Sequence, residues 1–401
     1  VGDFDFSRGS AATRINSLGL IENVSSGQSR LEYPMIDGVV NGCPSLLLEP
    51  SRTNLVTYSE DFSQWTASDL TVTDNNAISP DGTLNASKLV LTSGTSVKRI
   101  ALASMPTSSV ARSFSIFFKT NDINSIQLLH SGDLQGYARF DLVNYTVGSV
   151  GSKTTATIEN YGNGWYKCTA IFNSTNTFGS TLYMYSSDSA IGSYGGSTSE
   201  VGDLFIYGAM YEEGSFPTSY IKSNSGSTTT RAAETANGAG DASTFNDSEG
   251  VLMAEVSVPY KPSNQIISLS DSTNSDIIFV QFTPTNMFVK IAINGFGEST
   301  IHSQSYDVNT LYKVSLKYNG TNTVAYINGF ISSIGNVTLS NSFTLGLSKL
   351  GFNYPTGVLP FYGNTKQIQY YNSALTDSEL EELTSWTSFT AMAQGQQYSI
   401  K

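Results

Sequence analysis

Tyrosines in expected loops are the side chains of this sequence whose chemistry stands out first. Tyr137 follows a glycine, Tyr194 stands among glycines, and Tyr354 precedes a proline. A tyrosine ring can stack on the C–H face of a sugar, while amides and carboxylates bond the sugar hydroxyls. We therefore predict these tyrosines as ligand-binding residues. The alternative for each is an ordinary surface or core position, because apolar atoms supply much of any protein surface.

Carboxylates that could cleave a glycosidic bond do not form a recognisable pair. Such hydrolysis needs two carboxyl groups at a fixed separation across the bond. Glu212 and Glu213 are adjacent, so a strand places them on opposite faces. Glu379, Glu381 and Glu382 fall on the exposed side of an expected helix. We predict that the chain is no enzyme, with a glycoside hydrolase or lyase as the residual alternative.

Histidine and cysteine chemistry is equally unsupported. His130 and His302 lie far apart in the sequence, and neither belongs to a catalytic motif. Cys43 and Cys168 cannot build a disulfide scaffold or a metal cluster by themselves. No nucleophile elbow, metalloprotease helix or phosphate loop occurs. We expect structural histidines and ordinary thiols.

Length and charge exclude several classes of protein. The 401 residues include 33 acidic and 21 basic side chains, a net charge of −12, which argues against a nucleic-acid partner. No apolar run approaches the roughly 20 residues of a membrane helix, so we predict no membrane insertion. The 22 Tyr and 21 Phe need burial, which excludes a disordered chain. Because the sequence begins at Val1, we expect a processed chain or a fragment.

The elements that must position these side chains are short strands. Runs rich in Val, Ile, Thr, Tyr and Phe alternate apolar with polar residues and are separated by Gly, Asn, Asp and Ser. No helices stand between them, which argues against a parallel α/β fold. The expected strands include Ala86–Leu91, Phe114–Lys119, Ser125–Leu129, Ala138–Leu142, Thr181–Tyr185, Leu204–Glu212, Val251–Val258 and Tyr312–Tyr318.

One stretch near the C-terminal end predicts a short helix. Thr376 and Glu379 have the spacing of a capping box, in which each side chain satisfies a backbone N–H of the other's residue. Leu375 and Leu380 occupy the positions of a hydrophobic staple around it. Leu383 shares a face with Leu380, so we expect an amphipathic helix lying on a sheet.

The predicted fold class is all-β, with two antiparallel β-sandwich or jelly-roll domains, a short N-terminal β region and one short C-terminal helix. Residues 223–248 are Ser, Thr, Gly, Ala and Asn with almost no large apolar side chain, which predicts a linker or an extended surface segment. The expected divisions are 1–56 for the N-terminal β or attachment region, 57–222 for the first jelly roll, 223–248 for the linker, 249–386 for the second jelly roll and 387–401 for the tail.

The second block resembles the laminin-G-like, concanavalin-type family of lectins and glucanases. The resemblance is carried by residues 312–321, by 324–329 and by the closing stretch 368–380. It covers about residues 249–386 and implies a two-sheet antiparallel jelly roll that commonly serves binding.

The first part resembles the N-terminal region of bacteriophage tail-fibre and virion-appendage proteins. Residues 4–15, 46–55, 58–65 and 211–221 carry this resemblance. The body between them is similar to carbohydrate-binding-module jelly rolls, which pack a Trp-Tyr pair at a strand start, as at Trp165. The resemblance implies a protein of the virion surface that forms a homo-oligomer, with a trimer as the candidate state.

These resemblances also imply a structural calcium site, because jelly rolls of both types often hold one. Asp203 stands where carbohydrate-binding modules place an acid near the final strand, and Glu60 or Asp61 could join it. The alternative is that these acids cap turns.

The expected function is therefore recognition of a host-surface glycan by a phage tail fibre or virion appendage, through non-covalent adhesion. Repeated copies on one particle would add avidity to weak single sites. Expected partners are a host polysaccharide, other virion proteins and further copies of this chain, in an extracellular setting. The alternatives are a purely structural capsid or tail decoration protein, a polysaccharide depolymerase and a secreted bacterial adhesin.

Overall fold

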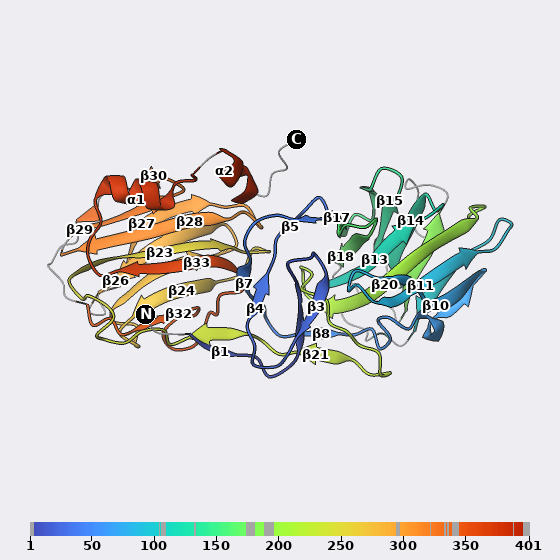
Figure 1. Cartoon of the computed structure of the whole chain (residues 1–401), viewed down its shortest axis with the longest axis horizontal. Coiled ribbons are helices and arrows are strands. Elements are labelled where there is room, and N and C mark those ends of the chain that lie inside the picture. Colours follow the sequence, from blue (N-terminus) through green and yellow to red (C-terminus); the bar gives the residue numbers. More distant parts are fainter. Residues whose placement is uncertain are drawn as a thin grey trace.

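The computed structural model of the chain is almost entirely β, as predicted. It describes residues 4–103, 105, 110–131, 134–173, 181–187, 196–293, 297–320, 322–332, 334, 337–338, 345–387 and 389–395. Two β-sandwiches stand at opposite ends of an elongated molecule, and strands of the N-terminal segment lie between them (Figure 1). None of the helices among the described residues has the length and apolar character to cross a membrane.

The first sandwich consists of two six-stranded antiparallel sheets. Phe114, Leu89 and Leu204 of one sheet pack against Ile126 and Leu128 of the other to form its core. Sheet 1 has the order β10 (Leu70–Ile78), β11 (Leu84–Leu91), β20 (Gly202–Glu213), β13 (Arg112–Thr120), β18 (Tyr166–Phe172) and β17 (Thr154–Asn160). Sheet 2 has the order β16 (Thr146–Val150), β15 (Tyr137–Asp141), β14 (Ser125–His130), β19 (Leu182–Ser187), β12 (Arg99–Leu102) and β9 (Thr66–Ser68).

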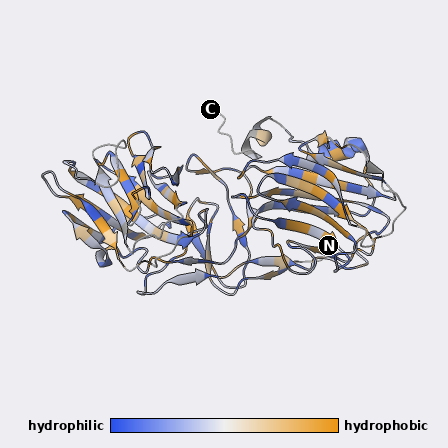
Figure 2. Cartoon of the chain, turned by 180° about the vertical axis from the view of Figure 1, so that it is seen from behind, coloured by the Kyte–Doolittle hydropathy of each residue, from blue (hydrophilic) through white to orange (hydrophobic). Residues whose placement is uncertain are grey.

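The second sandwich pairs an eight-stranded sheet with a five-stranded one, and Leu252, Val314 and Ile278 lie in its core. Apolar and polar residues are mixed along the strands, as alternating sides require (Figure 2). Sheet 3 contains β30 (Phe330–Ile331), β29 (Asn322–Ile327), β28 (Tyr312–Asn319), β23 (Glu249–Ser257), β33 (Gly363–Tyr371), β7 (Ser45–Leu48) and β4 (Arg30–Glu32), with β31 (Val337–Thr338) beside β29. Sheet 4 contains β27 (Glu298–Ser305), β26 (Asn286–Ala292), β25 (Ile277–Phe282), β24 (Gln265–Ser270) and β32 (Lys349–Gly351).

The N-terminal segment is built into both halves of the molecule. Its strands β7 and β4 extend sheet 3, and Leu48 enters the core of the second sandwich. The tyrosine-containing core beside sheet 1 includes Ile15 and Ile21 from the same segment. The remaining short strands are β1 (Asp5–Ser7), β2 (Ala12–Ile15), β3 (Ile21–Val24), β5 (Met35–Ile36), β6 (Val39–Val40) and β8 (Arg52–Asn54).

Residues 223–248, predicted as a linker or an extended surface segment, contain short strands that pair with the N-terminal segment. They are β21 (Thr229–Arg231), which pairs with β8, and β22 (Thr235–Asn237), which pairs with β1. Arg231 and Glu234 are buried, and Phe245 joins the core of the second sandwich. The segment has few large apolar residues, and its buried charged side chains Arg231 and Glu234 pair with residues elsewhere in the chain.

Those partners form a buried network of ion pairs, which we call the junction network: Arg8, Arg30, Glu49, Arg231 and Glu234. Arg8 lies 2.6 Å from Glu234, and Arg30 and Arg231 each lie 2.9 Å from Glu49. Arg30 also bonds Glu234. Burial acts to raise the pKa of Glu49, but the guanidinium groups of Arg231 and Arg30 outweigh it and lower the pKa to about 2. The network ties residues 231–234 to positions 8, 30 and 49 of the N-terminal segment.

The predicted helix is confirmed as α1 (Asp377–Thr384), which Figure 1 shows lying on the second sandwich. Thr376 and Glu379 form the capping box, and Leu380 is buried with Leu375 and Leu383 packed near it. A second helix, α2 (Phe389–Gly395), lies in the expected tail, so one helix was too few. The Leu311 N–H donates to the Gly395 carbonyl and anchors this segment.

Both histidines are buried side chains. His130 ends β14, and its ring stacks on that of Tyr211 with centroids 5.3 Å apart. Burial lowers the pKa of His130 to about 4, and the nearby charge of Arg112 adds to this shift. Burial lowers the pKa of His302 as well.

Loss of one junction carboxylate should be costly. We expect Glu234→Gln to lower the free energy of unfolding by about 3–5 kcal/mol, because it leaves the buried Arg8 guanidinium without a charge partner and Arg30 with Glu49 alone. The matched control is Glu22→Gln, since Glu22 pairs with Arg14 at a partly exposed site and should cost about 0–1 kcal/mol. Urea unfolding followed by tryptophan fluorescence measures both. Equal losses in the two variants would contradict a structural role of the network.

His130 should give the free energy of unfolding a pH dependence before most carboxylates titrate. Between about pH 6.5 and pH 4 the unfolded chain binds a proton at His130 that the folded chain does not, so His130 contributes a decrease in the free energy of unfolding with falling pH. Burial raises the pKa of Glu32 to about 7, which contributes an increase in the same range. We expect His130→Phe to remove the decrease, so that stability falls less on acidification than in the wild type, as measured by urea unfolding at half-unit pH steps. An unchanged slope would show that His130 is not the group responsible.

Candidate functional site

The outer face of sheet 2 carries an unusual row of polar and aromatic side chains. Ile100, Leu128 and Ala138 point into the core of the first sandwich, so their neighbours along each strand point outward. The strand register then places four outward residues opposite one another on β12, β19, β14 and β15. In order across the sheet they are Arg99, Tyr185, Gln127 and Arg139. At about 4.8 Å per strand, this row spans roughly 14 Å.

A second row lies directly beside the first. It contains Tyr183 of β19 opposite Leu129 of β14, and Leu129 is opposite Tyr137 of β15. Tyr183 and Tyr185 lie two positions apart on one strand, with ring centroids 5.6 Å apart. We call the set Arg99, Gln127, Tyr137, Arg139, Tyr183 and Tyr185 the tyrosine–arginine face.

Arg99 is the best-defined member of this face. Its Nη1 donates to the Tyr185 hydroxyl at 2.9 Å, and its guanidinium carbon lies 4.8 Å from the ring centre of Tyr183. The distance to the Tyr185 ring centre is 5.7 Å. Its Nε is buried and has no hydrogen-bond partner, and no described carboxylate forms an ion pair with it. Among the described residues, aromatic rings rather than a carboxylate thus hold this guanidinium group.

The side chains of this face on β14 and β15 are almost completely buried. Gln127 is fully buried, and Arg139 is 5% exposed. Burial lowers the pKa of Arg139 below its ordinary value, and the neighbouring Tyr137 opposes that shift. An arginine remains charged at any physiological pH, so this face keeps positive charge in a poorly hydrated place.

The chemistry of this arrangement suits an anion attached to a ring. A guanidinium group can donate parallel hydrogen bonds to a carboxylate or sulfate. The tyrosine rings offer flat apolar area and a hydroxyl. Removing the site from bulk water strengthens such charge-assisted bonds. A sugar that bears an acidic group combines all the features that these side chains can bind.

The predicted ligand-binding tyrosines separate in the structure. Tyr137 belongs to the tyrosine–arginine face, on β15. Tyr354 lies on the second sandwich, where it packs on the outer side of sheet 4 with its ring edge-on to Phe279 at 6.4 Å. Tyr194 lies outside the described residues. The structure therefore does not join Tyr137 and Tyr354 in one site.

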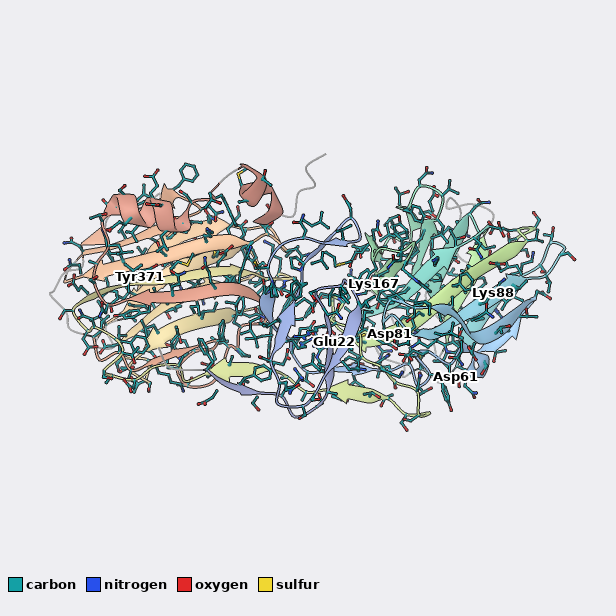
Figure 3. The ribbon with its side chains drawn as sticks, viewed as in Figure 1. Glu22, Asp61, Asp81, Lys88, Lys167 and Tyr371 are labelled. Carbon is teal, nitrogen blue, oxygen red and sulfur yellow. The ribbon has the colours of Figure 1, made fainter. Side chains whose placement is uncertain are left out.

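The predicted calcium ligands are each engaged with other side chains. Asp203 forms an ion pair with Lys88 at 2.9 Å, and Figure 3 shows Lys88 and Asp61 at separate places on the first sandwich. Glu60 accepts from the Tyr220 hydroxyl at 2.9 Å and from Lys222. Asp61 accepts from Ser63 in a short turn. Within the described ranges, no group of three or more His, Cys, Asp or Glu side chains is placed to hold a metal, so calcium stays a prediction.

Most of the tyrosine–arginine face was not predicted from the sequence. Its strongest local signal is the alternation Leu182-Tyr183-Met184-Tyr185, which places two tyrosines on one side of a strand. Arg99 and Tyr185 are 86 positions apart, so only the pairing of β12 with β19 brings them together.

Comparisons with known proteins give weak similarities. No family model matches the chain, and no curated protein is similar to it. Among solved structures, the sialidase carbohydrate-binding module CBM40 of Ruminococcus gnavus with α2,3-sialyllactose is 17% identical, covers 37% of this chain and 93% of its own, and has a TM-score of 0.31. Domain 4 of a Geobacillus stearothermophilus arabinanase with arabinotriose is 15% identical, covers 38% of this chain and 73% of its own, at 0.32.

A further similarity spans more of the chain. Domains LG4-5 of the mouse laminin α1 chain are 10% identical, cover 69% of this chain and 90% of their own, and have a TM-score of 0.25. Similarities at this level carry no functional assignment. The two-sandwich fold therefore rests on the sheets and registers described above.

Proposed function

We propose that this chain binds a glycan that carries carboxylate or sulfate groups, through the tyrosine–arginine face. The observation that supports this most is Arg99, whose guanidinium lies over Tyr183 with a buried Nε that has no hydrogen-bond partner among the described residues. A buried charged donor is costly unless it is satisfied, and a ligand oxyanion would satisfy it. The Tyr183 and Tyr137 rings would lie along the apolar side of the bound sugar.

The net charge of −12 means that overall charge cannot attract an acidic glycan to this chain. An acidic protein repels a polyanion at long range, so binding would depend on local guanidinium contacts rather than on overall attraction. Such contacts act at short range, and those at exposed positions weaken as the salt concentration rises. The binding step is non-covalent, and no catalytic role belongs to the proposal.

The biological setting that we propose follows from the sequence resemblance to phage appendages. In this setting the chain is displayed on a virion as a homo-oligomer, with a trimer as the candidate state, and recognises a polysaccharide of the host surface. Several copies on one particle would multiply a weak single-site affinity. A calcium ion with a structural role belongs to the same proposal.

The test compares an acidic and a neutral polysaccharide. In affinity electrophoresis we expect polygalacturonate in the gel, and not dextran, to retard migration of the chain. Arg99→Met should weaken the affinity for polygalacturonate at least about tenfold, because a charge-assisted bond is lost. Arg14→Met is the matched control, since Arg14 pairs with Glu22 in the N-terminal hairpin and should leave binding unchanged.

Equal effects of Arg99→Met and Arg14→Met would refute a site on sheet 2 and indicate non-specific charge. Failure to bind any member of a broad panel of bacterial polysaccharides, by folded protein in its native oligomeric state, would favour a structural role in the virion. Circular dichroism and urea unfolding of each variant verify that the fold is kept.

A further inference from the structure

A separate cavity lies on the opposite side of the first sandwich, where the N-terminal hairpin meets sheet 1. Its volume is about 250 Å³. Three turns surround it: the β2–β3 turn with Gly19 and Leu20, the β10–β11 turn from Ile78 to Gly82, and the turn before β18 from Tyr161 to Trp165. Figure 3 shows Glu22 of β3 and Asp81 of the β10–β11 turn on the two sides of this boundary.

Defined contacts hold the two aromatic side chains that line the cavity. Trp165 is 2% exposed, and its Nε1 donates to the Ile78 carbonyl at 3.1 Å. Tyr161 lies edge-on to Phe117 with centroids 4.9 Å apart. Leu20 and Pro80 complete an apolar lining on the other side. Fixed rings of this kind offer a preformed surface for the C–H face of a small ring.

The backbone explains why the cavity forms at this place. Gly162 has a φ of +76°, and a Cβ there would lie 2.5 Å from the Gly38 carbonyl oxygen. Glycine thus allows the turn before β18 to approach the N-terminal segment closely. The space beside that contact is left open between the two segments.

Lys119 contributes a positive charge to this lining. It lies on β13 opposite Phe205 of β20, which in turn is opposite Lys88 of β11. Lys88 has an ion-pair partner in Asp203, whereas Lys119 has no ion pair or hydrogen bond from its ammonium group to any described residue. Its stem packs over the turn, since a Cβ on Gly164 would lie 3.3 Å from Lys119 Cε.

We propose that this cavity binds one carboxylate-bearing sugar ring, with Lys119 paired to the carboxylate and Trp165 and Tyr161 against the ring. Binding sites for drug-sized molecules occupy about 300–1,000 Å³, so a cavity of 250 Å³ suits a single ring rather than a chain of sugars. The site is independent of the tyrosine–arginine face, because it lies on sheet 1. A bound ring would contact Leu20 as well as Trp165 and would therefore hold the N-terminal hairpin against the first sandwich.

The experiment uses the full chain carrying Arg99→Met, so that the face on sheet 2 does not contribute. Saturation-transfer NMR at low salt measures binding of glucuronate, with glucose as the neutral counterpart. We expect saturable binding of glucuronate only. Adding Lys119→Met should weaken it at least about tenfold, and adding Leu20→Trp, which fills the cavity and keeps the charge, should abolish it.

Lys349→Met on β32 of the second sandwich is the control and should leave glucuronate binding unchanged. Glucuronate binding that persists with Lys119→Met, or that survives Leu20→Trp, would overturn the proposal, as would equal binding of glucose. If the Arg99→Met chain loses polygalacturonate binding but still binds glucuronate, the two sites are supported separately. If the wild-type chain binds polygalacturonate through Arg99 but the Arg99→Met chain binds no glucuronate, only the proposal for the cavity is refuted.

Discussion

The junction network is the interaction on which the rest of this structure depends. Arg8, Arg30 and Arg231 are fully buried, and charges in such a place are tolerated only when they are paired and hydrogen-bonded. Glu49 and Glu234 supply those pairs from two other parts of the chain. Because each carboxylate serves more than one guanidinium, the N-terminal segment and residues 223–248 must fold together with it.

This constraint determines how the two sandwiches are joined. The N-terminal segment extends sheet 3 through β7 and β4, and its β2–β3 hairpin packs beside sheet 1. Phe216, which follows the first sandwich, stacks on Tyr260 of the second with centroids 3.6 Å apart. The connection therefore combines buried charge with aromatic packing.

Local patterns predicted local structure well. The capping box at Thr376 and Glu379 predicted α1 because its hydrogen bonds join residues three apart. Alternation predicted the strand that carries Tyr183 and Tyr185, because successive side chains of a strand point to opposite faces. The burial within residues 223–248 could not be predicted, because Arg231 and Glu234 resemble surface residues until their partners at positions 8, 30 and 49 are known. Of the candidate face, only Tyr137 was predicted, since the strand pairing that places Arg99 opposite Tyr185 is a long-range property.

Hydrogen–deuterium exchange of the wild-type chain with a galacturonic acid oligomer tests the central proposal most directly. The account predicts ligand-dependent protection of β12, β14, β15 and β19, the strands that carry the tyrosine–arginine face. Sheets 3 and 4 should exchange at the same rate with and without the oligomer. Protection confined to the second sandwich, or no protection at a concentration that saturates binding, would contradict glycan recognition by this face.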